Sequence, residues 1–228
     1  MSYFNYLPNN PDSKILNNSY NLLINTHKVC NDFIKLYDLI KIQNITEKDS
    51  IEVSILDLYR SALLFASSGL DSLVKQLVRD CLADVIKNNI GAEERFRVYV
   101  EKKLSRNDNQ NMKTISRALV SQDPRSYFLD ELIYEITDKS LQSNDELLNV
   151  ASYFDIPSPI LVDDFQKLKK AFTIRNQIAH EMDFDHKTNK RRKRTTSELF
   201  ESTDYIFQIS EKFLTEVDNK LIHEKMNT

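Results

Sequence analysis

The sequence predicts an all-α protein, and three observations support this fold class. The chain of 228 residues contains only two glycines and five prolines, too few for a sandwich or barrel, which needs a turn roughly every 8 to 12 residues. Apolar residues recur at three- and four-residue steps over long stretches without proline, as in amphipathic helices. The apolar content of 41% suffices for a buried core in a chain of this length.

Two long helices are expected in the N-terminal half. The first covers residues 12–41, where Leu16 and Leu23 belong to one apolar series. The strongest pattern covers residues 49–89 and is expected to form the central helix of the fold. Gly69 lies inside this segment, where glycine is less favourable than alanine by about 1 kcal/mol. We therefore expect another helix to pack closely against Gly69.

The remaining helices follow from breaks in the pattern. Gly91 is expected to end the central helix. Pro159 suits the first turn of a later helix, and Thr195 with Glu198 forms a capping box before the last one. The expected helices cover residues 92–104, 112–120, 126–137, 145–154, 160–182 and 197–223.

The whole chain, residues 1–228, is expected to form one helical domain. Its core covers about residues 50–220, and residues 1–45 form an N-terminal helical extension. The sequence contains no repeat of fixed period and no low-complexity linker that would divide it.

The composition excludes several classes of protein. Dinucleotide folds and Walker A loops need two or three glycines in a short window, but Gly69 and Gly91 lie far apart, so no nucleotide cofactor is expected. Cys30 and Cys81 lack metal-ligand spacing and lie beside apolar neighbours, which favours buried, reduced thiols. No stretch approaches the roughly 18 apolar residues of a membrane span, and the N-terminus lacks a signal-peptide pattern. We expect a soluble cytoplasmic protein without membrane contact.

The segment 160–182 contains a charged residue where apolar ones are expected. Counted at about 100° per residue from Leu161, a buried stripe is predicted through Phe165, Leu168, Phe172 and Ala179. Arg175 lies beside this stripe, Asn176 on its other side and His180 at its edge. Because a charge is rarely buried without a partner, either Arg175 pairs with an acid such as Asp71, or this helix end faces a cleft or a second subunit. In the first case His180 only closes a helix end, where imidazolium is favoured.

A family resemblance bears on this choice. The stretch RNQIAH, residues 175–180, resembles the signature of HEPN domains: arginine, a polar residue, three variable residues and histidine. Residues 60–80 are similar to the long second helix of that family, and the Ser-Leu-Gln-Ser stretch at 140–143 is similar to its RiboL-PSP branch. The likeness covers about residues 50–220. It implies a HEPN-like helical bundle, here with extra N-terminal and middle helices.

The resemblance implies a metal-independent endoribonuclease in which two protomers combine their motifs in one composite cleft. RNA supplies its own nucleophile, the 2′-hydroxyl. His180 would act as general acid or base near neutral pH, Arg175 would hold the phosphate oxygens, and Asn176 would orient the histidine or the phosphate. The products would be 2′,3′-cyclic phosphate and 5′-hydroxyl ends, without metal or cofactor. The family also implies a toxin or antiviral defence effector, controlled by an antitoxin or a nucleotidyltransferase partner.

A basic segment follows the motif. The net charge of the chain is only −3, yet residues 186–195 carry six cations and no acid. Such a cluster is expected to bind the RNA backbone, although a solvated loop or a docking site for an acidic partner would have the same composition. Glu181, Asp183 and Asp185 lie nearby, but they lack a recognised metal-ligand spacing, so no metal site is expected. The six cations are Lys187, Lys190, Arg191, Arg192, Lys193 and Arg194.

Two other function classes remain open. A HEPN-like binding module would hold nucleotide, RNA or a partner protein without cutting RNA, and its binding would survive the loss of His180. A helical adaptor would use Arg175 only as a buried ion pair, so that its replacement would lower the melting temperature markedly.

Overall fold

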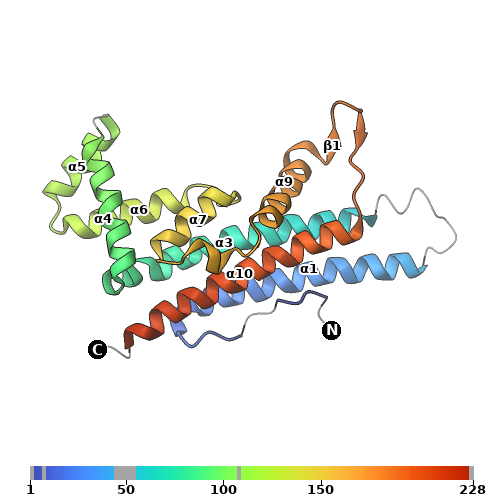
Figure 1. Ribbon diagram of the computed structural model, residues 1–228, viewed down its shortest axis with the longest axis horizontal. Helices are drawn as coiled ribbons and strands as arrows, with labels where there is room; N and C mark the ends of the chain where they lie inside the picture. Colours follow the sequence, from blue (N-terminus) through green and yellow to red (C-terminus); the bar gives the residue numbers. More distant parts are fainter. Residues whose placement is uncertain (1–2, 7–8, 44–54, 107–108, 226–228) are drawn as a thin grey trace.

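The computed structural model describes residues 3–6, 9–43, 55–106 and 109–225, and this part of the chain is almost entirely helical (Figure 1). The all-α fold class is therefore confirmed. In chain order the elements are a 3₁₀ turn η1 (Lys14–Leu16), α1 (Asn17–Gln43), α3 (Asp57–Asn88), α4 (Ile90–Ser105), α5 (Asn109–Val120), α6 (Pro124–Thr137), α7 (Asn144–Tyr153), α8 (Ser158–Leu161), α9 (Phe165–Glu181), the strands β1 (Phe184–Asp185) and β2 (Lys190–Arg191), and α10 (Thr196–Lys225).

Three long helices form the body of the molecule. Helix α3 packs along α1 and α10, so that the three lie side by side in an elongated bundle (Figure 1). Helices α4 to α7 gather at the end of the bundle where α3 ends, and α9 packs on α3 and α10 nearer the other end. The antiparallel hairpin of β1 and β2 projects beyond the end of α9. The expected central helix is confirmed as α3; residues 49–54 of that prediction lie outside the described part.

The two glycines have different structural roles: Gly69 lies where two helices cross, and Gly91 lies in the first turn of α4. A Cβ at Gly69 would overlap the side chain of Thr26, so α1 crosses α3 at this point, as predicted. Gly91 does not end the central helix, which is a correction. Helix α3 ends at Asn88, and Gly91 lies in the first turn of α4, where a Cβ would overlap the carboxylate of Asp155. Asn89 marks the true boundary, because its Oδ1 accepts a hydrogen bond from the backbone N–H of Ala92 at 2.9 Å.

Both cysteines are free and buried, as predicted. Burial raises the pKa of the Cys30 thiol and of the Cys81 thiol to about 12. Neither side chain is a thiolate at neutral pH, which removes both from consideration as nucleophiles. Among the described helices none is long and apolar enough to cross a membrane.

The expected helix 160–182 is divided in two. Helix α8 ends at Leu161, and Val162 adopts an extended backbone. Helix α9 begins anew at Phe165, where Asp164 Oδ1 accepts hydrogen bonds from Gln166 N at 2.9 Å and Lys167 N at 3.0 Å. Because the helix is interrupted, angles counted from Leu161 do not carry into α9.

The predicted buried stripe, whose four residues all lie in α9, is partly wrong. Leu168 and Phe172 are buried, but Phe165 is 42% exposed and Ala179 is exposed. Apolar contact with α3 and α10 fixes a different face of α9 toward the core. The buried residues of α9 are Leu168, Ala171, Phe172, Ile174 and Ile178.

Candidate active site

The three motif residues lie in the last two turns of α9, the helix that ends at Glu181. Arg175 shares the buried side of the helix with Ile174 and Ile178 and is itself half-buried. Asn176 and His180 are exposed, one turn apart on the outer side. The motif thus joins a partly desolvated cation to an exposed amide and an exposed imidazole.

Arg175 has an incomplete set of partners. Its Nη1 donates to Asn176 Oδ1 at 2.9 Å, but among the described residues no atom accepts a hydrogen bond from its buried Nε. The ion pair with Asp71, one of the two alternatives that the sequence left open, is not formed: that carboxylate contacts Lys75 Nζ at 3.0 Å and accepts the backbone N–H of Leu141 at 2.7 Å. Desolvation lowers the pKa of Arg175, and the charge of Asp71 only partly opposes this effect.

An arginine in this environment predicts a measurable stability effect. Arg175→Met keeps the length of the side chain and removes the guanidinium, which forms no ion pair with a carboxylate among the described residues and whose desolvation Asp71 offsets only in part. We expect the free energy of unfolding to stay equal or to rise by up to about 1 kcal/mol, measured by calorimetry. A structural adaptor predicts the reverse, a loss of about 3 to 5 kcal/mol.

The turn after the motif has an uncommon backbone. Met182 and Asp183 both have positive φ angles, 52° and 54°, a left-handed conformation that is unfavourable for residues other than glycine and asparagine or aspartate. Asp183 N donates to Gln177 O at 2.8 Å, which closes the C-terminal end of α9. The chain is thereby turned directly from the motif helix into the hairpin.

The turn is held by a buried ion-pair cluster of Asp183, Arg60 and Arg194. The sequence did not predict this cluster. The side chain of Asp183 is 0% exposed and contacts Arg60 Nε at 2.8 Å and Arg194 Nη2 at 3.0 Å. Arg60 is itself buried on α3 and reaches Asp57 Oδ1 at 3.1 Å. Its position on the buried face of the central helix, three residues before Leu63, is a signal that could have indicated an internal acidic partner.

The acids near the motif are engaged with the hairpin. Glu181 pairs with Arg192 Nη2 at 2.6 Å, and Asp183 pairs with Arg60 and Arg194. Asp185 accepts the backbone N–H of Lys187 at 2.9 Å, which together with other hydrogen bonds lowers the pKa of Asp185. The described residues contain no group of three potential ligands that could hold a metal ion.

The six predicted RNA-binding cations separate into two groups. Arg191 makes a bidentate contact with Asp57, Arg192 contacts Glu181, and Arg194 contacts Asp183 and Glu198. Those three arginines are ion-paired within the chain. The other three are exposed and pair with no residue that the structure describes: Lys187, Lys190 and Lys193.

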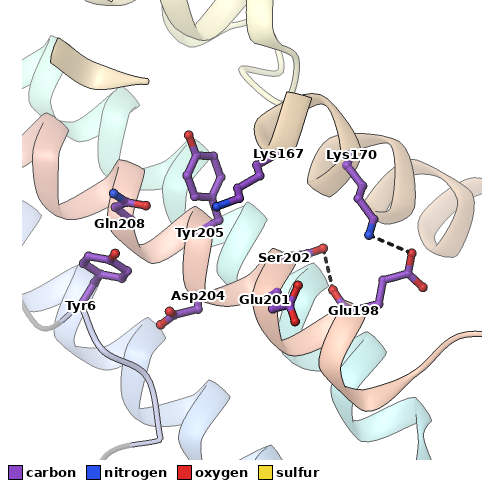
Figure 2. Close-up of a pocket in the computed structure, with 9 residues that line it drawn as sticks. All are labelled: Tyr6, Lys167, Lys170, Glu198, Glu201, Ser202, Asp204, Tyr205 and Gln208. Atoms are coloured by element: carbon purple, nitrogen blue, oxygen red, sulfur yellow. Dashed lines mark hydrogen bonds and ion pairs between the residues drawn. The ribbon is translucent and has the colours of Figure 1, made fainter. Parts of the chain in front are cut away.

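A separate cavity of about 380 Å³ lies between the N-terminal arm, the start of α9 and α10 (Figure 2). No residue of the 175–180 motif lines it. Lys170 on one wall pairs with Glu198 at 3.3 Å. Of the predicted capping box, Thr195 Oγ1 accepts the backbone N–H of Glu198 at 3.1 Å, whereas the Glu198 carboxylate contacts Lys170 and Arg194. Tyr205 donates to Asp163 Oδ1 at 2.6 Å. Lys170, Glu198 and Tyr205 are thus engaged with other side chains of the protein.

Comparison with known proteins found no matching family model, no similar curated protein and no similar solved structure. The motif at residues 175–180 and the geometry around it are the features of this protein that bear on its function.

Proposed function

We propose that this protein is a metal-independent endoribonuclease of HEPN type. One observation carries the proposal: a half-buried arginine, without a carboxylate partner among the described residues, lies in the same helix end as an exposed histidine. Structural arginines in protein interiors normally end in ion pairs. A guanidinium held without one is available to bind an anion, and a phosphodiester is the anion that the neighbouring imidazole can act upon.

Each motif residue has one chemical task. Arg175 holds the nonbridging oxygens of the scissile phosphate through the N–H groups of its Nη atoms, since its Nε is buried, and this contact stabilises charge in the transition state. His180 transfers the proton of the attacking 2′-hydroxyl or of the leaving 5′-oxygen. Asn176 Oδ1 accepts a hydrogen bond from Arg175 Nη1, which fixes the direction of the guanidinium. The products are a 2′,3′-cyclic phosphate and a 5′-hydroxyl.

The proposal includes a homodimer. In one protomer His180 is exposed and has no hydrogen-bond partner among the described residues, so nothing in that part of the chain fixes its ring. A second motif facing the first would supply both the orientation and a second arginine. The biological role we propose is that of a toxin or antiviral defence effector, restrained by an antitoxin or a nucleotidyltransferase partner.

The direct test uses end-labelled single-stranded RNA incubated with the purified protein in excess EDTA. We expect cleavage that leaves 2′,3′-cyclic phosphate ends. A matched strand built of 2′-deoxynucleotides is expected to stay intact, because it lacks the nucleophile.

Three results would contradict this proposal: equal cleavage of both strands, cleavage only after a divalent metal is added, or 3′-hydroxyl ends. Tight RNA binding without cleavage would instead favour the alternative, a non-catalytic HEPN-like module that binds nucleotide or RNA or docks a partner. The observation that favours this alternative is the exposed ring of His180, which no described residue of the same protomer orients for catalysis.

A further inference from the structure

The basic hairpin contains two kinds of cation, and the difference between them assigns separate tasks. Lys190 and Arg191 are adjacent in β2, yet Arg191 Nη1 contacts Asp57 Oδ2 at 3.1 Å and its Nη2 contacts Asp57 Oδ1 at 2.5 Å, whereas Lys190 pairs with no described residue. Lys187 and Lys193 are exposed in the same way. The carboxylate in an ion pair offsets the positive potential of its cation, so a paired cation attracts an external anion less strongly than an unpaired one does.

The arginines hold the base of the hairpin to the central helix. Arg192 N donates to Asp183 O at 2.8 Å, and Arg60 Nη2 donates to Arg192 O at 3.4 Å. Arg192 Nη1 also donates to Phe184 O at 2.5 Å. These contacts, together with the buried carboxylate of Asp183, fix the direction in which the hairpin leaves α9 (Figure 1).

Lys187 and Lys190 lie on an arm of fixed direction beside the motif, and Lys193 follows β2 at the base of this arm. Strand β1 begins at Phe184, directly after the turn that ends α9, and the hairpin projects away from the three-helix bundle (Figure 1). A nucleic acid strand lying along the hairpin therefore passes the end of α9 that holds His180. Lysine suits this contact because its ammonium is a hydrated point charge on a flexible stem, which can follow a mobile phosphodiester backbone.

We propose that Lys187, Lys190 and Lys193 bind the phosphodiester backbone of single-stranded RNA, and that Arg191, Arg192 and Arg194 position the arm without contacting RNA. The identity of the ligand rests on the proposed ribonuclease function, whereas the division of tasks rests on the ion pairs. Each lysine that displaces a counterion adds to the salt dependence of binding, by about 0.7 in the logarithmic slope for single strands.

The test measures binding of a fluorescent single-stranded RNA to the full-length His180→Ala protein, so that the RNA stays intact, over a series of salt concentrations. The triple variant Lys187→Ala, Lys190→Ala, Lys193→Ala is expected to reduce the slope of log K against log salt by about two. Two single variants, Lys190→Ala and Arg191→Gln, form a matched comparison because the two residues are neighbours in β2. The lysine variant is expected to reduce the slope by about 0.7, and the arginine variant to leave it unchanged.

The outcomes separate this inference from the proposed function. An unchanged slope in the triple variant, or no measurable RNA binding, overturns the inference even if the wild-type protein cleaves RNA. An equal loss of slope in Lys190→Ala and Arg191→Gln overturns the division of tasks. A lysine-dependent slope in a protein that cleaves no RNA supports the inference and contradicts the nuclease. Melting curves of each variant establish that it is folded.

Discussion

His180→Ala is expected to reduce the rate of RNA cleavage by about 10² to 10⁴-fold, the range that a positioned general acid or base contributes. Its melting temperature is expected to stay within about 2 °C of the wild-type value, because a surface substitution changes stability by about 0.5 kcal/mol or less. The side chain is exposed and pairs with no residue in the described part of the chain. Initial rates with labelled RNA in excess EDTA and calorimetric melting curves measure the two effects.

The matched control for this experiment is His186→Ala. His186 is also exposed and lies on the hairpin, where its ring packs edge-on against Phe184 with centroids 5.8 Å apart. It belongs to the same region but not to the motif, so its variant is expected to cleave RNA at the wild-type rate. If His180→Ala keeps full activity, or if both variants lose it equally, the motif is not the catalytic site.

Local signals made most of the fold predictable from the sequence. The apolar period of three and four residues placed the C-terminal end of α3 and both ends of α10 within a few residues of those observed, because long amphipathic helices carry the same signal over many turns. The packing at Gly69 was predictable for a different reason: a glycine inside a helix is unfavourable unless a neighbour needs the space, and Thr26 occupies it.

The prediction for α9, the helix that holds the 175–180 motif, was only partly correct. Val162 and Asp164 interrupt the regular backbone between α8 and α9, so Leu161, from which the angles were counted, is not part of α9. The four residues of the predicted stripe do share one face of α9, but packing against α3 and α10 buries the neighbouring face instead. The apolar period alone does not reveal such a break. Asp164, a favourable N-cap residue directly before Phe165, was the signal that could have placed the true start.

The ion pairs of the hairpin depend on contacts that are distant in the sequence. Arg60 and Asp183 are separated by 123 positions, and no periodicity links a residue of α3 to a turn after α9. The sequence therefore indicated one basic surface of six cations, whereas three of them are engaged with Asp57, Glu181 and Asp183. The tertiary fold decides which charges remain free to act.

Asp183→Asn is expected to lower the free energy of unfolding by about 3 to 5 kcal/mol, which is the effect of removing one partner from a buried ion pair. The carboxylate is 0% exposed, and the substitution removes the buried negative charge next to Arg60 and Arg194. The two arginines then keep only the more exposed carboxylates of Asp57 and Glu198. Asparagine is chosen because it tolerates the left-handed backbone that Asp183 adopts, with φ 54°. The variant therefore isolates the lost charge from backbone strain.

Melting curves of single and double variants test whether Asp183 and Arg60 stabilise the fold together. For a chain of this length the expected loss corresponds to a decrease of about 6 to 20 °C in melting temperature. Asp185→Asn, which changes a hairpin acid that is not buried, is expected to lower stability by about 1 kcal/mol or less. The double variant Arg60→Met, Asp183→Asn should lose much less stability than the sum of the two single effects, because without Asp183 the buried guanidinium of Arg60 keeps only the more exposed Asp57. If the losses add, Arg60 and Asp183 are not coupled, and the turn after His180 is held by its backbone hydrogen bonds alone.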